Sequence, residues 1–327
     1  MGMLSRNAIL ALSATLCICA PAWTAELAYP FKPVRIIVGF PPGGTADILA
    51  RALAREMSEA WGQQFVVDNR PGAGSRVGSE LVSKAAPDGY TLLVVTSSHV
   101  VNAVVSRESG YDAVESFTSI SMIAGTALGV LSNPSLPVKS VRELIAFAKP
   151  RPGQLHFGSS GTASTTHLAG ELISSMAGIK LVHVSYKGGV ASLNDVLGGQ
   201  IPLLMISWPT SIPQVKSGRL RGLGITARER SKALPEVPTV AESGLTGYEA
   251  VQWYALLGPA GLSAELTGRL NAEVARIVRA PKVVDPNFVA NMGADPMTSS
   301  AQEFRAYMQS EVVKWSKVAR QIALDKN

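Results

Sequence analysis

Short apolar runs alternate along the chain with segments whose apolar residues recur at helical spacing. The run RIIVGF at 35–40 stops at two prolines and two glycines. A helical pattern follows at 46–60, with apolar residues at 48, 49, 52, 53 and 57. This alternation of strand and helix signals is typical of α/β units built on a mostly parallel sheet.

The same alternation continues toward the end of the chain. Further strands are expected at 65–68, 91–95, 155–157, 181–185, 202–206, 220–226 and 251–257. Further helices are expected at 77–86, 141–148, 165–176, 191–197, 264–279 and 301–324, and a proline-rich loop at 234–244. The pattern therefore predicts an α/β fold.

Two strand-to-helix turns resemble each other. FPPGGTAD at 40–47 and FGSSGTAS at 157–164 each place glycines and a Gly-Thr-Ala sequence between a strand and a helix. Open α/β sheets bind ligands at the carboxyl ends of their strands. Two such turns therefore suggest two lobes that hold one ligand from opposite sides.

The first turn is suited to an anion. Gly43 and Gly44 lack a Cβ atom, so a ligand can approach their N–H groups closely. The first N–H groups of a helix have no acceptor within it, and the helix dipole adds positive charge there. A carboxylate or phosphate suits this place, while Asp47 could cap an N–H group or accept from a ligand ammonium or water. The turn alone leaves a purely structural role open.

Nucleotide-binding motifs do not fit these glycines. A phosphate-binding loop requires Lys-Ser or Lys-Thr after its last glycine, but Thr45 and Ala46 follow Gly44. The glycines at 72, 74 and 78 come nearer to the dinucleotide pattern, but their spacing is one residue too long. We therefore expect no cofactor.

A secreted serine hydrolase using Ser160 is the alternative suggested by the second turn. Ser159 and Ser160 lie between a strand and a helix, and His167 follows nearby. The nucleophile elbow requires G-x-S-x-G, which GSSG at 158–161 lacks. His167 is expected on the helix that starts at this turn, a poor position for the base of a triad. Hydroxyl and N–H groups at a helix start serve a carboxylate equally well, and Ser164 could simply cap the helix.

Two further turns carry small or polar residues. Ser97 and Ser98 follow the strand at 91–95, and Tyr186-Lys-Gly-Gly189 follows the strand at 181–185. Four such turns at strand ends form the expected rim of one cleft. The four histidines show no metal-binding spacing, so we expect no metal site.

Composition narrows the classes of function. Hydrophobic residues make up 46% and charged residues 17% of the 327 residues, which is enough to build one large core or two ordinary ones. Only 6% of residues are aromatic and the basic residues form no long run, which argues against nucleic-acid binding. The net charge of +6 favours the approach of small anions and equally serves solubility.

The N-terminus has the form of a secretory signal peptide. Arg6 precedes an apolar run of 13 residues at 8–20, which is too short to span a bilayer. Ala20-Pro21-Ala22 then matches an A-x-A cleavage site. We expect a signal peptide at 1–22, cleaved after Ala22 or alternatively after Ala25.

Cysteine usage agrees with export. Cys17 and Cys19 are the two cysteines of the chain, and both lie inside the expected signal. Neither follows the small residue that a lipoprotein signal needs. We therefore expect a freely soluble periplasmic protein without disulfides or thiol chemistry.

Several short sequences in a fixed order resemble those of one family. They are Tyr29-Pro-Phe-Lys-Pro33, Phe40-Pro-Pro-Gly-Gly44 with Asp47, Asp68-Asn-Arg-Pro-Gly-Ala-Gly74, Pro87-Asp-Gly-Tyr-Thr91, Tyr186-Lys-Gly-Gly189, Pro238-Thr-Val-Ala-Glu-Ser-Gly244 and Pro259-Ala-Gly261. From about Tyr29 to near its C-terminus, the chain resembles the Bug family of periplasmic solute receptors. These receptors are the extracytoplasmic components of tripartite tricarboxylate transporters.

The resemblance implies a fold of two lobes, like a type II periplasmic binding protein, each lobe a mostly parallel sheet flanked by helices. Lobe 1 would comprise 23–122 and 254–327, and lobe 2 would comprise 123–253. The resemblance implies no catalysis, and a small organic anion, mainly a carboxylate, bound between the lobes. We expect a monomer that works with the membrane subunits of a tripartite tricarboxylate transporter. A sensor partner with the same pocket is an alternative.

The turns and the resemblance together nominate a set of ligand-binding residues. They are Phe40, Pro42, Gly43, Gly44, Thr45, Asp47, Ser97, Ser98, Ser159, Ser160, Gly161, Thr162, Tyr186, Lys187, Gly188, Ser207 and Trp208.

Two departures from the family bear on the ligand. Family members often carry Gly-Asn where this chain has Ser75-Arg76, and many carry a Phe-Asp-Asn-like sequence where it has Ile206-Ser-Trp208. The missing acidic residue would have accepted from a ligand ammonium, so the hypothesis is that an amino acid is disfavoured as the ligand. Trp208 would then pack against an apolar or aromatic part of the ligand.

Overall fold

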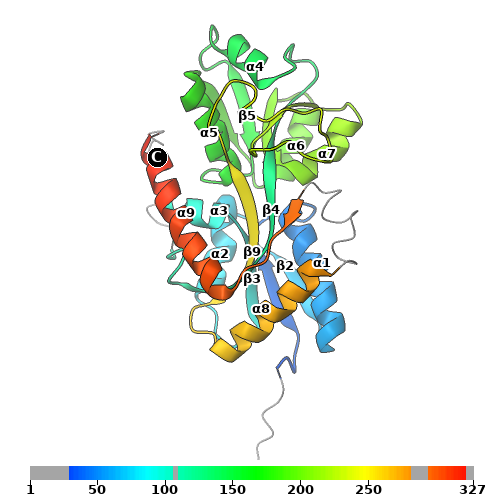
Figure 1. The fold of residues 1–327 in the computed structure, drawn as a ribbon, viewed down its shortest axis with the longest axis vertical. Coiled ribbons are helices and arrows are strands. Elements are labelled where there is room, and N and C mark those ends of the chain that lie inside the picture. The colour runs from blue at the N-terminus through cyan, green and yellow to red at the C-terminus, as the bar shows by residue number, and fades with distance from the viewer. Residues whose placement is uncertain (1–28, 106–109, 281–293, 322–327) are drawn as a thin grey trace, which may run out of the picture.

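The computed structural model describes residues 29–105, 110–280 and 294–321. The chain forms two lobes stacked along its long axis and joined by strands that run through both (Figure 1). The predicted signal peptide and the last residues of the helix expected at 301–324 lie outside the described residues.

The first lobe is built on a parallel sheet that β9 and β4 extend. Strands β1 (Val34–Val38), β2 (Phe65–Asn69) and β3 (Thr91–Thr96) run parallel in the order β2-β1-β3, and β9 (Val251–Pro259) joins β3 antiparallel. A 3₁₀ turn, η1 (Ala73–Ser75), precedes α2. The helices of this lobe are α1 (Thr45–Trp61), α2 (Arg76–Ser83), α3 (Ser98–Val105), α8 (Ala264–Arg279) and α9 (Ala301–Gln321).

The second lobe repeats this architecture. Strand β5 (Leu155–Ser159) pairs in parallel with β6 (Leu181–Ser185) and with β7 (Leu203–Ser207), while β8 (Arg221–Ile225) pairs antiparallel with β4. The helices are α4 (Val141–Ala148), α5 (Thr165–Ala177), α6 (Gly189–Leu197) and α7 (Trp208–Lys216). This lobe occupies the upper part of Figure 1.

Two long strands connect the lobes. In β4 (Phe117–Ser132), the residues up to Ala127 pair with β9, and those from Leu128 onward pair with β7 and β8. β9 carries the chain back, with Val251 opposite Ala127, and β10 (Ala294–Pro296) also pairs with β4. The lobe boundaries expected after residues 122 and 253 fall inside these strands and stay predictions.

Apolar layers cover both faces of each lobe's sheet. Successive strand residues point to opposite faces, so Ile36 packs into the core that contains α1 and α8, and Ile37 into the core that contains α3 and α9. In the second lobe, Met205 and Ile206 of β7 divide in the same way between two cores. Burial on both faces explains why these strands are continuous apolar runs in the sequence.

The described residues contain five elements that the sequence analysis did not predict: η1, α3, β4, α7 and β10. The other elements agree with the expected ones apart from their ends. In α3 the consecutive residues from Ser98 to Asn102 are all buried, polar and apolar alike, so its sequence lacks the alternation of apolar and polar faces that marks a surface helix. β4 is longer than a typical strand, at 16 residues. α7 contains Pro209 in its first turn and Pro213 inside it, and prolines normally argue against a helix.

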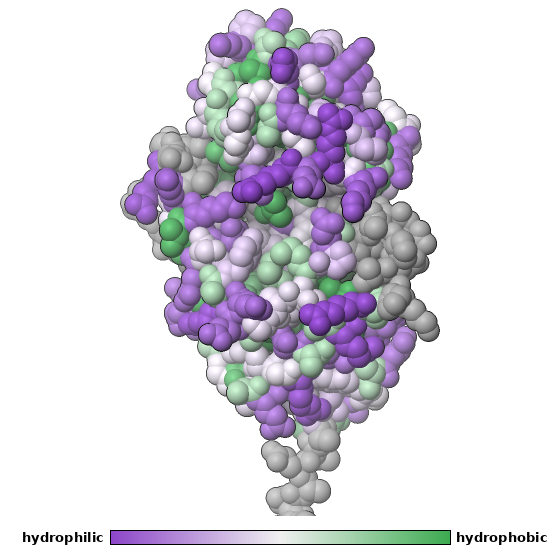
Figure 2. All heavy atoms as spheres, viewed as in Figure 1, coloured by the Kyte–Doolittle hydropathy of each residue, from purple (hydrophilic) through white to green (hydrophobic). Residues whose placement is uncertain are grey.

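Hydrophilic residues are spread over both lobes on the face shown in Figure 2, with apolar residues scattered among them. Among the described helices, none is both long and apolar enough to cross a membrane.

The C-terminal helix is attached to the first lobe through a buried carboxylate. Glu311 is 3% exposed and accepts hydrogen bonds from the indole N–H groups of Trp253, at 3.1 Å, and Trp315, at 3.0 Å. We predict that Glu311→Ala lowers the free energy of unfolding by about 2–5 kcal/mol, because two buried N–H groups lose their acceptor. Urea titration would measure this. Lys314→Ala, which removes only the partly exposed partner of Glu311, should cost under about 1 kcal/mol. Equal losses in both variants would contradict the prediction.

Candidate functional site

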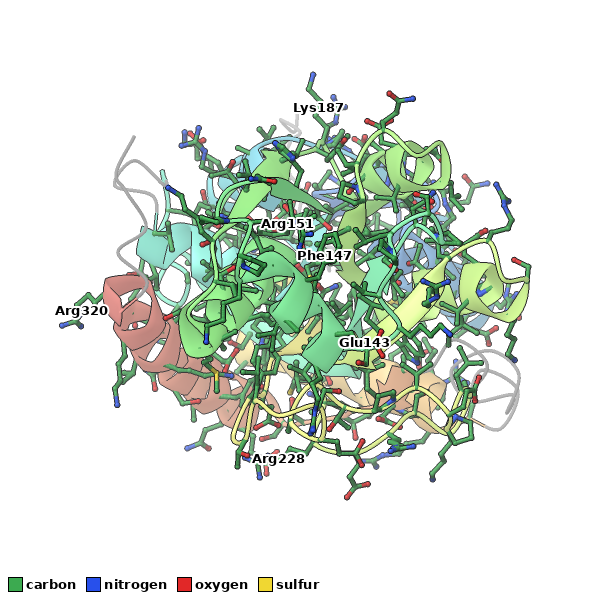
Figure 3. All side chains as sticks on the ribbon, turned by 90° about the horizontal axis from the view of Figure 1, so that it is seen from above. Glu143, Phe147, Arg151, Lys187, Arg228 and Arg320 are labelled. Atoms are coloured by element: carbon green, nitrogen blue, oxygen red, sulfur yellow. The ribbon has the colours of Figure 1, made fainter. Side chains whose placement is uncertain are left out.

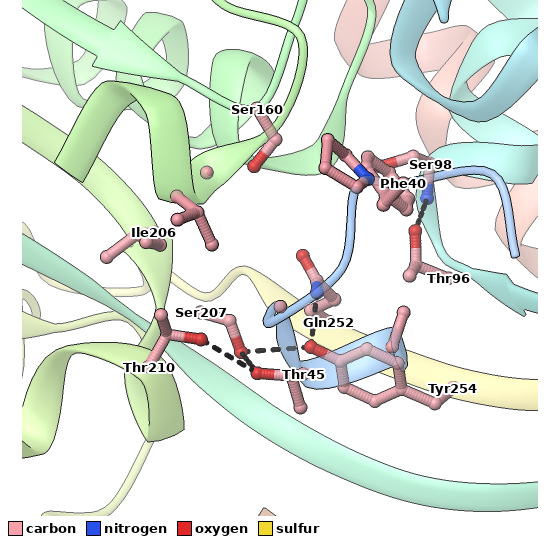
Figure 4. Close-up of a pocket in the computed structure, with 15 residues that line it drawn as sticks. Phe40, Thr45, Thr96, Ser98, Ser160, Ile206, Ser207, Thr210, Gln252 and Tyr254 are labelled. Carbon is pink, nitrogen blue, oxygen red and sulfur yellow. Dashed lines mark hydrogen bonds between the residues drawn. The ribbon is translucent and has the colours of Figure 1, made fainter. Parts of the chain in front are cut away.

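A small cavity lies between the lobes, where the carboxyl ends of strands from both sheets meet (Figure 4). Its volume is about 50 Å³, well below that of typical ligand pockets, so the lobes lie close together in this structure. The lining residues are Phe40, Pro41, Gly44, Thr45, Ala46, Thr96, Ser98, Ser160, Gly189, Val190, Ile206, Ser207, Thr210, Gln252 and Tyr254.

Several helices begin at this cavity. Thr45 opens α1, Ser98 opens α3, Gly189 opens α6 and Ser207 precedes α7. The turn before α5 adds Ser160. The first N–H groups of each helix lack an acceptor within it, and each helix dipole places partial positive charge at its start. None of the described residues that line the cavity is charged, so its electrostatic preference for anions comes from backbone groups and hydroxyls.

A chain of hydroxyl groups crosses the cleft at one end of the cavity. Thr45 Oγ1 of the first lobe donates to Ser207 Oγ of the second at 3.2 Å and lies 3.0 Å from Thr210 Oγ1. Ser207 Oγ is also 2.9 Å from the hydroxyl of Tyr254, which accepts from the amide of Gln252 at 2.5 Å. These side chains form one network around that end of the cavity (Figure 4).

A second set of hydroxyl contacts joins the starts of α3 and α5. Thr165 Oγ1 lies 2.7 Å from Ser97 Oγ, and the Thr165 N–H group donates to Ser98 Oγ at 3.1 Å. Thr165, Ser97 and Ser98 are all buried. The two networks hold the lobes together through neutral hydrogen bonds.

Asp47 supports the first turn from behind and does not line the cavity. Its carboxylate accepts from the Gly43 N–H group at 3.0 Å, from Asn69 Nδ2 at 3.0 Å and from Arg51 Nε at 3.0 Å. Burial alone would raise the pKa of Asp47, but the bonds from Arg51, Gly43 and Asn69 outweigh it and hold the pKa below its usual value. The carboxylate is therefore charged, and its charge is balanced by Arg51, whose guanidinium lies 3.0 Å away.

The structure brings some of the predicted ligand-binding residues to the cavity. These are Phe40, Gly44, Thr45, Ser98, Ser160 and Ser207.

Other predicted residues lie in the turns around the cavity without lining it. Pro42 and Gly43 are exposed on the outer side of the first turn. Gly161 and Gly188 are buried where the lobes touch, and a Cβ atom on Gly188 would lie 2.7 Å from Pro41 Cδ. Thr162 is exposed, and its N–H group donates to Ser185.

Three further predicted residues do not line the cavity. Ser159 is fully buried, with its hydroxyl 2.6 Å from His183 Nε2. Tyr186 donates to Asp195 at 2.7 Å. Lys187, nominated as a ligand-binding residue, is exposed and extends from the edge of the molecule in Figure 3.

The expected role of Trp208 also requires correction. Trp208 is 0% exposed and belongs to the apolar core of the second lobe, where a Cβ atom on Gly129 would lie 2.9 Å from its ring. It begins α7, and its side chain turns to the core while Ser207 before it and Thr210 after it reach the cavity. In this arrangement its ring cannot pack against a ligand.

Some lining residues were missed by sequence reasoning. Thr96, Gly189 and Ile206 adjoin predicted residues and could have been included with them. Gln252 and Tyr254 had no such signal, because they lie inside β9 and reach the cavity only through the pairing of that strand.

A pair of stacked histidines lies behind the second turn. The rings of His167 and His183 are 3.8 Å apart, and the Ala163 N–H group donates to His167 Nδ1 at 3.3 Å. Burial lowers the pKa of His167 to about 3, with a contribution from His183, and burial lowers that of His183 to about 4. Both rings are therefore neutral at pH 7. No group of three or more metal-ligating residues occurs in the described ranges.

This geometry defines a class of protein: a two-lobed solute-binding protein of the periplasmic type with an anion-binding cleft. A sequence profile described as "Tripartite tricarboxylate transporter family receptor" matches residues 49–324. The chain therefore belongs to the tripartite tricarboxylate transporter receptor family, which confirms the resemblance to the Bug receptors. The family comprises solute-binding proteins rather than enzymes.

Individual relatives agree with this assignment. BugT of Bordetella pertussis is 34% identical over 295 residues, which cover 90% of each chain. A solved R. palustris protein with adipate is 36% identical, with a TM-score of 0.86 over 90% of this chain and 98% of the other. MatC from Rhodopseudomonas palustris with bound malate is 25% identical, with a TM-score of 0.84 over 89% of this chain and 99% of the other.

We predict that stability falls as the pH drops below about 6.5. The unfolded chain protonates its histidines near pH 6.5, whereas folded His99 and His183 have pKa values of about 4 and His167 of about 3. Between these values the unfolded state binds more protons, so each such histidine removes up to about 1.4 kcal/mol of stability per pH unit. Urea titrations at pH 7.5, 6.5, 5.5 and 5.0 would measure the slope. His167→Gln should reduce it, and an unchanged slope would refute the role of His167.

We also predict that Gly188→Ala weakens ligand binding by obstructing closure. The added Cβ atom would lie 2.7 Å from Pro41 Cδ of the opposite lobe, at a φ of +138°. Gly244→Ala is the matched control, because Gly244 has a φ of +113° and nothing lies within 4 Å of the added atom. Calorimetric titration with a small carboxylate that the wild type binds should show at least a tenfold loss of affinity for Gly188→Ala alone. The prediction fails if the two variants lose affinity equally.

Proposed function

We propose that this protein binds a small organic acid between its lobes in the periplasm and presents it to the membrane subunits of a tripartite tricarboxylate transporter. One observation carries the proposal: the starts of α1, α3, α6 and α7 meet at a cavity whose described lining is uncharged. Convergent helix starts stabilise a desolvated anion without a neutralising side chain. Family membership supports the transport role.

We further propose a dicarboxylate as the ligand. Two relatives of known structure were solved with adipate and with malate, and both of these ligands are dicarboxylates. Polar side chains lie at separate places around the cavity: Thr45 and Ser207 at one end, and Ser160 and Ser98 apart from them (Figure 4). An amino acid fits less well, since its ammonium group would find no carboxylate among these residues.

We propose that binding involves a hinge motion in β4 and β9. The cavity is small and the lobes are joined by direct hydroxyl contacts, so a ligand would have to enter with the lobes further apart. Phe40, Gly44, Thr45, Ser98, Ser160 and Ser207 would then contact the ligand after closure. The glycines at 161 and 188 would act by letting the two backbones approach.

The proposal includes export. A cleaved signal at 1–22 and a monomeric mature protein remain expectations from the sequence, and solved relatives described as periplasmic support the location. No observation favours a hydrolase, because the two histidines near Ser160 have other partners: His183 pairs with Ser159, and His167 accepts from Ala163. The sensor alternative would use the same cavity. It differs from the transport role in the membrane protein with which the receptor interacts.

We predict that adipate and malate raise the unfolding temperature of the wild type, whereas dimethyl adipate does not. A ligand at a hundred times its Kd adds about 2.7 kcal/mol to the stability of the folded state. The diester lacks the charges that the helix starts stabilise, so its effect should be absent.

Thr45→Val keeps the shape of the side chain but loses its hydroxyl bonds across the cleft, and should weaken adipate binding about tenfold or more.

The control for this prediction is Thr246→Val, on an exposed site in the second lobe. Stabilisation by the diester equal to that by adipate would contradict an anion site. Ester turnover that disappears in Ser160→Ala would favour the hydrolase instead.

A further inference from the structure

Gln252 brings an amide group to the cavity from inside β9. Its side chain is 8% exposed and lines the cavity beside Tyr254, two residues further along the same face of the strand. The amide nitrogen donates to the Tyr254 hydroxyl at 2.5 Å. The amide oxygen consequently points away from Tyr254 and into the space among the lining residues (Figure 4).

This contact bears on which hydrogens of the neighbouring hydroxyl groups are available to a ligand. Because Tyr254 accepts from Gln252, its own hydrogen is available to Ser207 Oγ, at 2.9 Å. Ser207 Oγ also accepts from Thr45, at 3.2 Å. When Tyr254 is the donor in its contact with Ser207, both acceptor positions of Ser207 are used and its one hydrogen is left for a ligand.

This end of the cavity therefore offers a donor and an acceptor side by side. The N–H groups at the start of α1 and the Ser207 hydroxyl are donors suited to a carboxylate. The Gln252 oxygen is an acceptor, and a carboxylate has no hydrogen to give it. A hydroxyl on the carbon next to the carboxylate would supply that hydrogen.

We propose that Gln252 is a specificity-determining residue that selects 2-hydroxy dicarboxylates over unsubstituted dicarboxylates. This inference rests on the proposed function. An unsubstituted ligand leaves the buried Gln252 oxygen without a donor, and unpaired polar groups in a closed site lower affinity. An ammonium in place of the hydroxyl would lose its hydration without a compensating charge, since the described lining residues are neutral.

The test compares matched pairs of acids by calorimetry: succinate with malate, and glutarate with 2-hydroxyglutarate. For the wild type, the hydroxy acid should bind about tenfold more tightly than its partner, the effect of one buried hydrogen bond. Gln252→Leu removes the acceptor, and the ratio of the two Kd values should fall to about one. Tyr254→Phe frees the amide to turn and should also reduce the ratio. Gln154→Leu, at an exposed position on the second lobe, should leave the ratio as it is in the wild type.

The possible results separate the two proposals. A wild type that binds these acids without preferring the hydroxy members would overturn the role of Gln252 and leave the proposed function intact. An amide that turns its NH₂ group to the carboxylate would bind both members of a pair, so Gln252→Leu would weaken both and preserve any ratio, which also overturns the inference. If the wild type binds no carboxylate at all, the proposed function fails and this inference fails with it. Circular dichroism would confirm that each variant is folded.

Discussion

The site depends on the hydrogen bond between Thr45 and Ser207, because this contact brings the start of a helix in one lobe against the start of a helix in the other. Each helix start carries N–H groups that the helix itself leaves unpaired. Either one alone is an ordinary feature of an α/β protein. Joined across a cleft, they surround a space in which an anion meets partial positive charge from both lobes.

The residues that line the cavity in the described part of the chain are uncharged, and this affects how the site can hold an anion. Arginine or lysine side chains would hold an anion strongly, but they would also repel one another in the empty site. Hydroxyl groups instead pair with each other across the cleft, as Thr165 does with Ser97. The lobes can therefore meet directly without repulsion between like charges. This suits a receptor that must both capture its solute and release it.

The sequence predicted the α/β fold because the strands are buried on both faces and the helices are amphipathic, as in β1 and α1. It predicted the turns at Gly44 and Ser160 because small residues at strand ends have a recognisable pattern. It could not predict Gln252 and Tyr254, whose position follows from the long-range pairing of β9 with β3 and β4. The prediction that Trp208 packs against the ligand was wrong for a related reason. Neighbouring residues at a helix start face opposite sides, and the sequence alone does not say which side faces the cleft.

The most direct test of the central claim is an anomalous difference map from crystals grown with bromosuccinate. The bromine marks the ligand without depending on how the density is interpreted. The account predicts a peak enclosed between the lobes, with a carboxylate within hydrogen-bond distance of the Thr45 N–H group and the Ser207 hydroxyl. A fully occupied peak outside this cavity, with the cavity holding only water, would contradict it.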